Sequence, residues 1–174
     1  EVSAVDALRQ VVELVKSNRN LSPNMLAPSN AFRFYTDASG GGCYTEAVNT
    51  VLLSFETSLR HLFGALASIY RDRGLPTINL RVWLGAMRYL ELIGDDLSLR
   101  DAGLCFVCSR MAVIDPRSDA GAKMESHLPF EGFLEALCRV AVLKAMPTDE
   151  EIEDSEFSHA GTFLAELHND TDAW

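Results

Sequence analysis

The chain has little of several features that mark specialised classes of protein. Its 174 residues include only four cysteines and six prolines, and 15 Lys and Arg face 25 Asp and Glu. The cysteines are too few and too irregularly spaced for a disulfide-rich secreted scaffold. We therefore expect free thiols in a reducing compartment. No apolar run approaches the roughly 20 residues that a membrane-spanning helix needs, so no membrane association is expected. The net charge of −10 argues against nucleic acid as a partner, because it repels phosphates.

What is present fits an ordinary globular protein. Hydrophobic residues make up 48% of the chain and charged residues 23%, and the length allows one sizeable core or two small ones. No positively charged, apolar leader follows Glu1, so we expect a cytoplasmic domain taken from a longer chain.

Apolar residues recur at intervals of three and four over most of the chain, which predicts helices. The expected helices cover residues 2–16, 45–70, 77–93, 98–112, 130–146 and 158–167. The segment 45–70 should form the longest, with about seven turns, and Ser98 with Asp101 fits a capping box. We expect a glycine turn at 37–43 and a mobile surface loop at 115–126. Because no longer segment alternates with period two, the predicted fold class is all-α.

The order of motifs between Asn79 and Lys144 carries a resemblance. A helix with Trp83 and Leu84 precedes a short link, a helix beginning LSLRDA, a polar loop, and the segment LPFEGFLEAL from Leu128. This order resembles EF-hand-like helical domains of the tubulin polymerization-promoting (p25-alpha) family and of flagellar and ciliary cytoskeletal proteins. The match covers residues 55–145. It implies an EF-hand-like domain, which we place over 1–147; the residues themselves predict an acidic connector and a C-terminal helix at 148–174.

Two of the candidate loops lack calcium ligands. An EF-hand loop needs oxygen ligands at positions one, three and five and a bidentate glutamate at position twelve. With Leu128 at position eight, Gly121 stands at one, Lys123 at three and Gly132 at twelve. The link at 94–97 is several residues too short to surround an ion. We therefore expect no calcium at either place.

A third candidate loop keeps part of the pattern. Asp37, Ser39 and Gly41 match positions one, three and five, but position twelve falls on Val48 and the nearest carboxylate, Glu46, stands at ten. We interpret this segment as a degenerate loop without a cofactor. The alternative is a weak calcium site, which would make the protein a calcium-responsive regulator that uses residues 37–48.

Asp37 also supports an enzymatic hypothesis. The segment Phe34–Gly40 resembles the first strand of ribonuclease H type nucleases, in which an aspartate helps to hold Mg²⁺. That fold needs a sheet to bring further carboxylates beside the first, and no later segment has the pattern of a strand. A metal-dependent nuclease is therefore the second alternative.

Cys105 and Cys108 have the CxxC spacing of zinc and dithiol sites. A zinc site would need a second ligand pair, and neither Cys43, Cys138 nor the four histidines provide paired spacing. We interpret the two cysteines as buried on one apolar helix face.

Other polar motifs have simpler interpretations. Ser58 with His61, and Glu125 with His127, are isolated pairs of the kind found on solvated surfaces. The glycines at 40–42 lack the lysine of a phosphate-binding loop. The acidic stretch 149–156 suits a solvated connector.

These observations favour a non-enzymatic protein-interaction module, EF-hand-like and without bound calcium. The resemblance implies a cytoskeletal or axonemal protein partner and a cytoplasmic location, in the flagellum or cytoskeleton. Paired EF-hands leave a helical groove for such a partner. The apolar candidates for lining it are Trp83, Met87, Phe130 and Phe133, although a place in the core is favoured for each of them.

Overall fold

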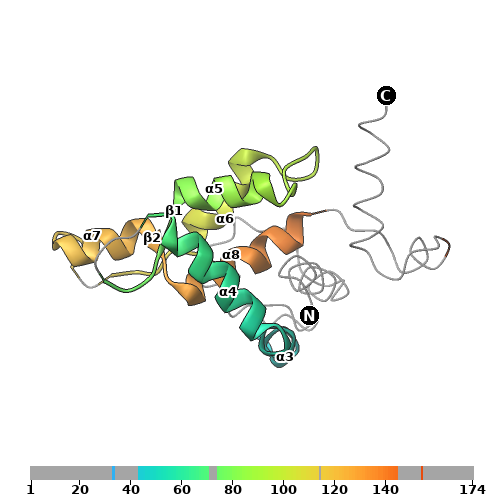
Figure 1. The fold of residues 1–174 in the computed structure, drawn as a ribbon, viewed down its shortest axis with the longest axis horizontal. Helices are drawn as coiled ribbons and strands as arrows, with labels where there is room; N and C mark the ends of the chain where they lie inside the picture. Colours follow the sequence, from blue (N-terminus) through green and yellow to red (C-terminus); the bar gives the residue numbers. More distant parts are fainter. Residues whose placement is uncertain (1–32, 34–42, 71–73, 114, 145–153, 155–174) are drawn as a thin grey trace.

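The computed structural model describes residues 33, 43–70, 74–113, 115–144 and 154. These residues form the following helices and strands: α3 (Glu46–Ser54), α4 (Glu56–Ser68), β1 (Ile78–Asn79), α5 (Leu80–Tyr89), α6 (Leu99–Cys108), α7 (Asp119–Ser126), β2 (His127–Leu128) and α8 (Phe130–Leu143) (Figure 1). The prediction of a mostly helical protein is confirmed. The helices expected at 2–16 and 158–167 lie outside the described residues, as do nearly all of the glycine turn and the acidic stretch.

A short antiparallel strand pair joins two halves of the chain. Ile78 of β1 lies opposite Leu128 of β2, and Asn79 lies opposite His127. Both Ile78 and Leu128 are completely buried. The pair links a first half, α4–β1–α5, to a second half, α6–α7–β2–α8.

The core forms where α4, α5, α6 and α8 meet. Trp83 and Phe133 are completely buried, with ring centroids 6.2 Å apart in an edge-to-face arrangement. Phe63 of α4 completes the aromatic group, 5.5 Å from the Phe133 ring. The indole Nε1 of Trp83 donates a hydrogen bond to the carbonyl oxygen of Ala102, 2.8 Å away on α6. This bond satisfies the one polar atom of a side chain that otherwise stabilises the core by apolar burial.

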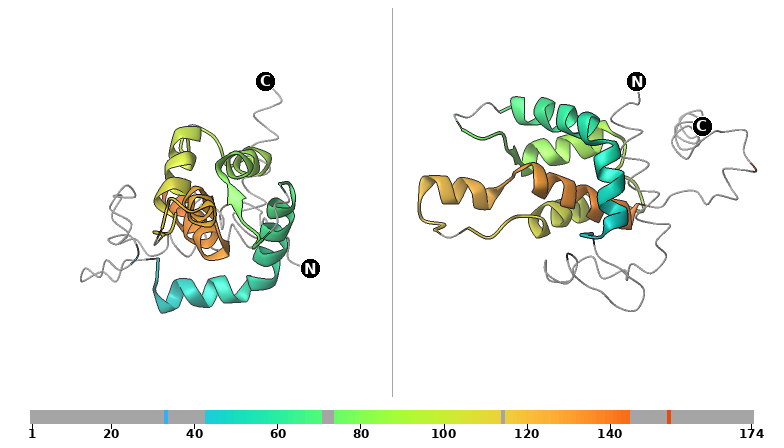
Figure 2. Two further views of the ribbon diagram at one scale, coloured as in Figure 1. Left: turned by 90° about the vertical axis from the view of Figure 1, so that its left-hand side faces the viewer. Right: turned by 90° about the horizontal axis from the view of Figure 1, so that it is seen from below.

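The single long helix predicted over 45–70 is wrong, because the chain turns at Phe55. Its φ of −109° and ψ of 9° are not helical, and α3 leaves α4 at a steep angle (Figure 2). The turn lets Phe55 and Leu59 enter the main core, while Val48 joins a smaller cluster with Cys138 and Ala141. No glycine or proline lies at the turn. The helical spacing of apolar residues continues across it, so the sequence pattern predicts one unbroken helix. The longest described helix is instead α8, with 14 residues.

α5 ends at Tyr89, four residues before the predicted end at 93. The N–H of Leu92 donates to the carbonyl of Met87 and that of Glu91 to the carbonyl of Arg88, which is the Schellman arrangement. Glu91 takes a left-handed φ of 55° to close it. A glycine usually occupies this position. Because the chain has Glu91 there, the sequence pattern does not indicate that the helix ends at Tyr89.

The expected short link between α5 and α6 is present. The N–H of Gly94 donates to the carbonyl of Leu97, whose side chain is fully buried. Lys144 Nζ reaches Asp96 Oδ1 at 2.8 Å and so ties the end of α8 to the link. Ser98 caps α6 as predicted, because its side chain accepts from the Asp101 N–H, but the helix ends at Cys108 rather than near 112.

The surface loop expected at 115–126 contains α7. Ser118 caps this helix by accepting from the N–H of Gly121. The Asp115 carbonyl packs so closely on Gly121 that a Cβ there would collide with it. No residue of α7 is buried, so the segment shows no apolar stripe from which a helix could be predicted.

Candidate functional site

The four residues predicted to line a partner groove lie in or against the core. Trp83 and Phe133 are fully buried, and Met87 is 1% exposed. Phe130 is half-buried, and its ring centroid lies 5.4 Å from that of Phe63. The guanidinium of Arg60 lies over the Phe130 ring, 4.3 Å from its centroid. Three of the four thus pack in the interior, which is the place that the sequence analysis favoured for each of them.

Of the weak metal candidates, the structure describes Glu46 alone. It is exposed in the first turn of α3. Asp37, Ser39 and Gly41 lie outside the described residues. Val48, expected at loop position twelve, is buried within α3. Within the described part of the chain, no group of three or more His, Cys, Asp or Glu could hold a metal ion.

The cysteines are free thiols with different surroundings. Cys105 is buried as expected, and this burial raises its pKa to about 12, while Cys108 is only half-buried. The structure also brings Cys43 and Cys138 into one small cluster, which the sequence spacing did not predict. Burial raises the pKa of Cys43 to about 12 and raises that of Cys138 further. Thiolate chemistry is disfavoured at these three positions.

The Ser/His and Glu/His pairs that the sequence singled out lie on α4 and around the end of α7. Ser58 and His61 both lie on α4, where His61 is exposed. His127 Nδ1 lies 3.0 Å from Ser126 Oγ and 2.9 Å from the carbonyl oxygen of Lys123. The His127 ring thus joins β2 to the end of α7.

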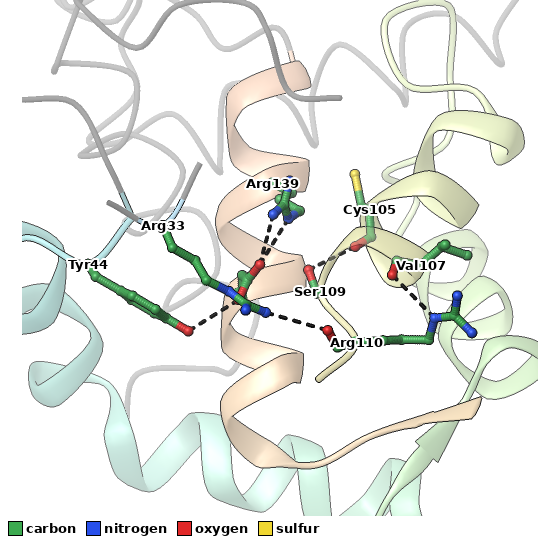
Figure 3. Close-up of polar contacts among 8 residues, drawn as sticks. Arg33, Tyr44, Cys105, Val107, Ser109, Arg110 and Arg139 are labelled. Carbon is green, nitrogen blue, oxygen red and sulfur yellow. Dashed lines mark hydrogen bonds and ion pairs between the residues drawn. The ribbon is translucent and has the colours of Figure 1, made fainter. Parts of the chain in front are cut away.

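A buried charged cluster is centred on Glu135 of α8. Its Oε2 accepts from Arg33 Nε at 2.6 Å and from the Tyr44 hydroxyl at 3.2 Å. Its Oε1 accepts from Arg139 Nη2 at 2.8 Å and from Arg139 Nε at 3.2 Å. Figure 3 shows Arg33 and Tyr44 reaching α8, the helix that carries Arg139, and Arg33 Nη2 also donates to the Arg110 carbonyl. One carboxylate therefore holds three segments of the chain together.

The electrostatics follow from this geometry. Burial acts to lower the pKa of Arg33, but the hydrogen bond and charge of Glu135 outweigh it, and the pKa is raised. Burial and then the charge of Glu135 raise the pKa of Tyr44 to about 12. The sequence held one signal of the cluster, since Glu135 and Arg139 stand at i, i+4 within an otherwise apolar part of α8. Its partners Arg33 and Tyr44 are remote in sequence, so no spacing pattern could identify them.

Beside this cluster lies a hollow of about 610 Å³, here called the α3/α8 hollow. It is lined by Cys43, Tyr44, Thr45, Glu46, Asn49, Leu52, Met111, Glu131, Leu134, Glu135 and Cys138. Its size is that of a ligand pocket, and its walls come from α3, α8 and the segment after α6. It is the best candidate functional site in the described part of the chain.

Comparisons with protein-family models, curated proteins and solved structures find no match for this chain. Among the described helices, none is long and apolar enough to cross a membrane.

Proposed function

We propose that the chain is a non-enzymatic protein-interaction module with an EF-hand-like fold that does not bind calcium. The observation that carries the proposal is the strand pair, in which Ile78 of one helix–loop–helix half lies opposite Leu128 of the other. Paired EF-hands join their loops in this way, through the apolar residue at position eight. The resemblance adds a cytoskeletal or flagellar partner to the proposal.

The register of the strand pair supports the absence of calcium. With Ile78 and Leu128 at position eight, position twelve falls on Val82 and Gly132, and neither supplies the bidentate carboxylate. Val82 is 6% exposed and belongs to the core. A Cβ on Gly132 would lie 3.1 Å from both the Ser109 carbonyl oxygen and Leu128, so a glutamate there would be crowded.

The second half departs further from an ion-binding loop. α7 fills the first six loop positions with a helix, and Lys123 at position three contributes a cation in place of an oxygen ligand. A cation at that point would repel calcium rather than coordinate it. Apolar burial at Ile78 and Leu128 holds the two halves together instead.

Calorimetric titration of the whole chain with millimolar calcium tests the proposal. We expect no binding heat and no change in the helical circular dichroism signal, while a calcium-binding EF-hand protein in the same buffer gives both. Heat together with a helical change would instead establish the calcium-responsive regulator.

Affinity capture from a ciliated-cell lysate tests the partner class. We expect enrichment of tubulin or axonemal proteins over a bead control. Their absence would remove the cytoskeletal part of the proposal.

A further inference from the structure

We propose that the α3/α8 hollow binds a basic, amphipathic segment of a partner protein, with apolar side chains inside the hollow and Lys or Arg against Glu46 and Glu131. This inference rests on the proposed interaction function, and it names the chemistry of the partner. It concerns a different surface from the groove that the sequence suggested.

The interior of the hollow suits apolar side chains. Leu52 reaches it from α3, Leu134 and Cys138 from α8, and Met111 from the segment after α6. Leu52 and Leu134 are half-buried and Met111 is 37% exposed, so apolar surface is open to a partner. Covering such surface is the main favourable contribution to association.

Charge at the rim selects the partner. Glu46 and Glu131 are both exposed, and neither side-chain carboxylate makes a hydrogen bond or ion pair among the described residues. Among the residues that the structure describes, no Lys or Arg lines the hollow. A second hollow of about 500 Å³ lies beside the end of α4; its described lining includes Lys123 and His127 and no carboxylate. The α3/α8 hollow is thus the one of these two that complements a cation, and the net charge of −10 strengthens this attraction.

The polar floor of the hollow is already satisfied. Glu135 accepts hydrogen bonds from Arg33, Tyr44 and Arg139, so its carboxylate is committed within the protein. A partner cation therefore meets Glu46 and Glu131 and not Glu135. The same cluster fixes Tyr44 and α8, which pre-organises two walls of the hollow.

The shape of the surface favours a polypeptide segment over a compact molecule. Glu46, Asn49 and Leu53 follow one another at spacings of three and four along one side of α3. Leu53 is 58% exposed and extends the apolar surface past the lining residues. From Glu46 to Leu53 the helix rises about 10 Å, which is the length of two turns of a docked helix.

Fluorescence polarisation with labelled synthetic helices tests the inference. The probe is a peptide with leucines at helical spacings of three and four and lysine at the other positions. Its matched control has glutamate in place of every lysine. We expect the intact chain to bind the lysine peptide at physiological ionic strength, and to bind it more weakly as salt is raised.

Two double variants separate the hollow from general charge attraction. Glu46→Gln with Glu131→Gln should weaken binding by about three- to ten-fold, the range of two exposed ion pairs. Glu91→Gln with Glu125→Gln removes the same charge on exposed residues outside the hollow and should leave the affinity within about two-fold. Asn49→Trp, on the exposed side of α3, should fill the hollow and abolish binding. Circular dichroism confirms that each variant is folded.

Several outcomes would overturn the inference. Two concern the variants: both double variants weaken peptide binding equally, or Asn49→Trp binds the lysine peptide as well as the unmodified chain does. Two concern the peptides: the chain binds the lysine and glutamate peptides equally, or it does not bind the lysine peptide. None of them bears on the calcium titration. Calcium heat would contradict the proposed function and leave peptide binding in the hollow as it stands.

Discussion

Replacing Glu135 with glutamine should destabilise the protein strongly, although the side chain keeps its shape. Glutamine removes the charge that holds Arg139, which is completely buried with Glu135 in the native state. Breaking a buried ion pair by removing one partner costs about 3–5 kcal/mol, because the remaining charge stays buried without compensation. Typical domains have a total stability of about 5–15 kcal/mol, so the variant should lose a large fraction of it.

The chain contains a matched control for this experiment. Glu56 and Arg60 form the same i, i+4 pair at 2.7 Å, but their side chains are 44% and 58% exposed. Glu56→Gln should therefore cost at most about 0.5 kcal/mol. Urea unfolding followed by circular dichroism measures both losses under the same conditions.

A double variant separates lost charge from lost packing. Glu135→Leu with Arg139→Met replaces the buried pair with apolar side chains, and it should be more stable than Glu135→Gln because no buried arginine of α8 is left unpaired. If Glu135→Gln lost no more stability than Glu56→Gln, the cluster would not hold the segments together and the reasoning would be refuted.

Three further predictions follow from local geometry. Glu91→Gly should raise stability by about 1 kcal/mol, since glycine adopts the left-handed φ without strain; thermal unfolding measures this, and no gain relative to Glu91→Ala would contradict it. Gly121→Ala should unfold α7 and raise its amide exchange, because the new Cβ meets the Asp115 carbonyl; unchanged protection would contradict the close contact. The pKa of Cys43 rises from 9.0 to about 12 on folding, so the unfolded chain loses this proton first and stability should fall from pH 9 to pH 12. Cys43→Ala should show a smaller alkaline loss in urea titrations at these pH values, and an equal loss would contradict the assignment.

The parts of the fold that the sequence predicted are those with a buried stripe. α5 buries one apolar face against the core, whereas α8 is buried on all sides over Glu135–Ala141; apolar residues at spacings of three and four indicated both helices. α7 has no buried face, and its helix depends on the Ser118 cap and on the close packing of Gly121 against Asp115. Periodicity carries no information about either contact.

The turn at Phe55 shows a second limit. The apolar spacing continues through it, but the buried residue of α3, Val48, lies in the smaller cluster, whereas the buried residues of α4 lie in the main core. Which cluster a residue joins depends on where α8 lies, and the core residues of α8 are more than 70 positions away in sequence. The α3/α8 hollow arises from the same long-range arrangement, so its lining could not be assembled from local spacing.

Under the proposed function, the way in which the two halves are held together determines how the module is regulated. In a calcium sensor, the ion supplies the difference in free energy between a closed and an open helix pair. Here Ile78 and Leu128 are fully buried, and Lys144 ties the end of α8 to Asp96 in the link before α6. These contacts need no ion, so under the proposal we expect the two halves to stay together without calcium. The interaction surface would therefore be formed at all calcium concentrations, and any regulation would act on the partner, by changing the charge of the segment that meets Glu46 and Glu131.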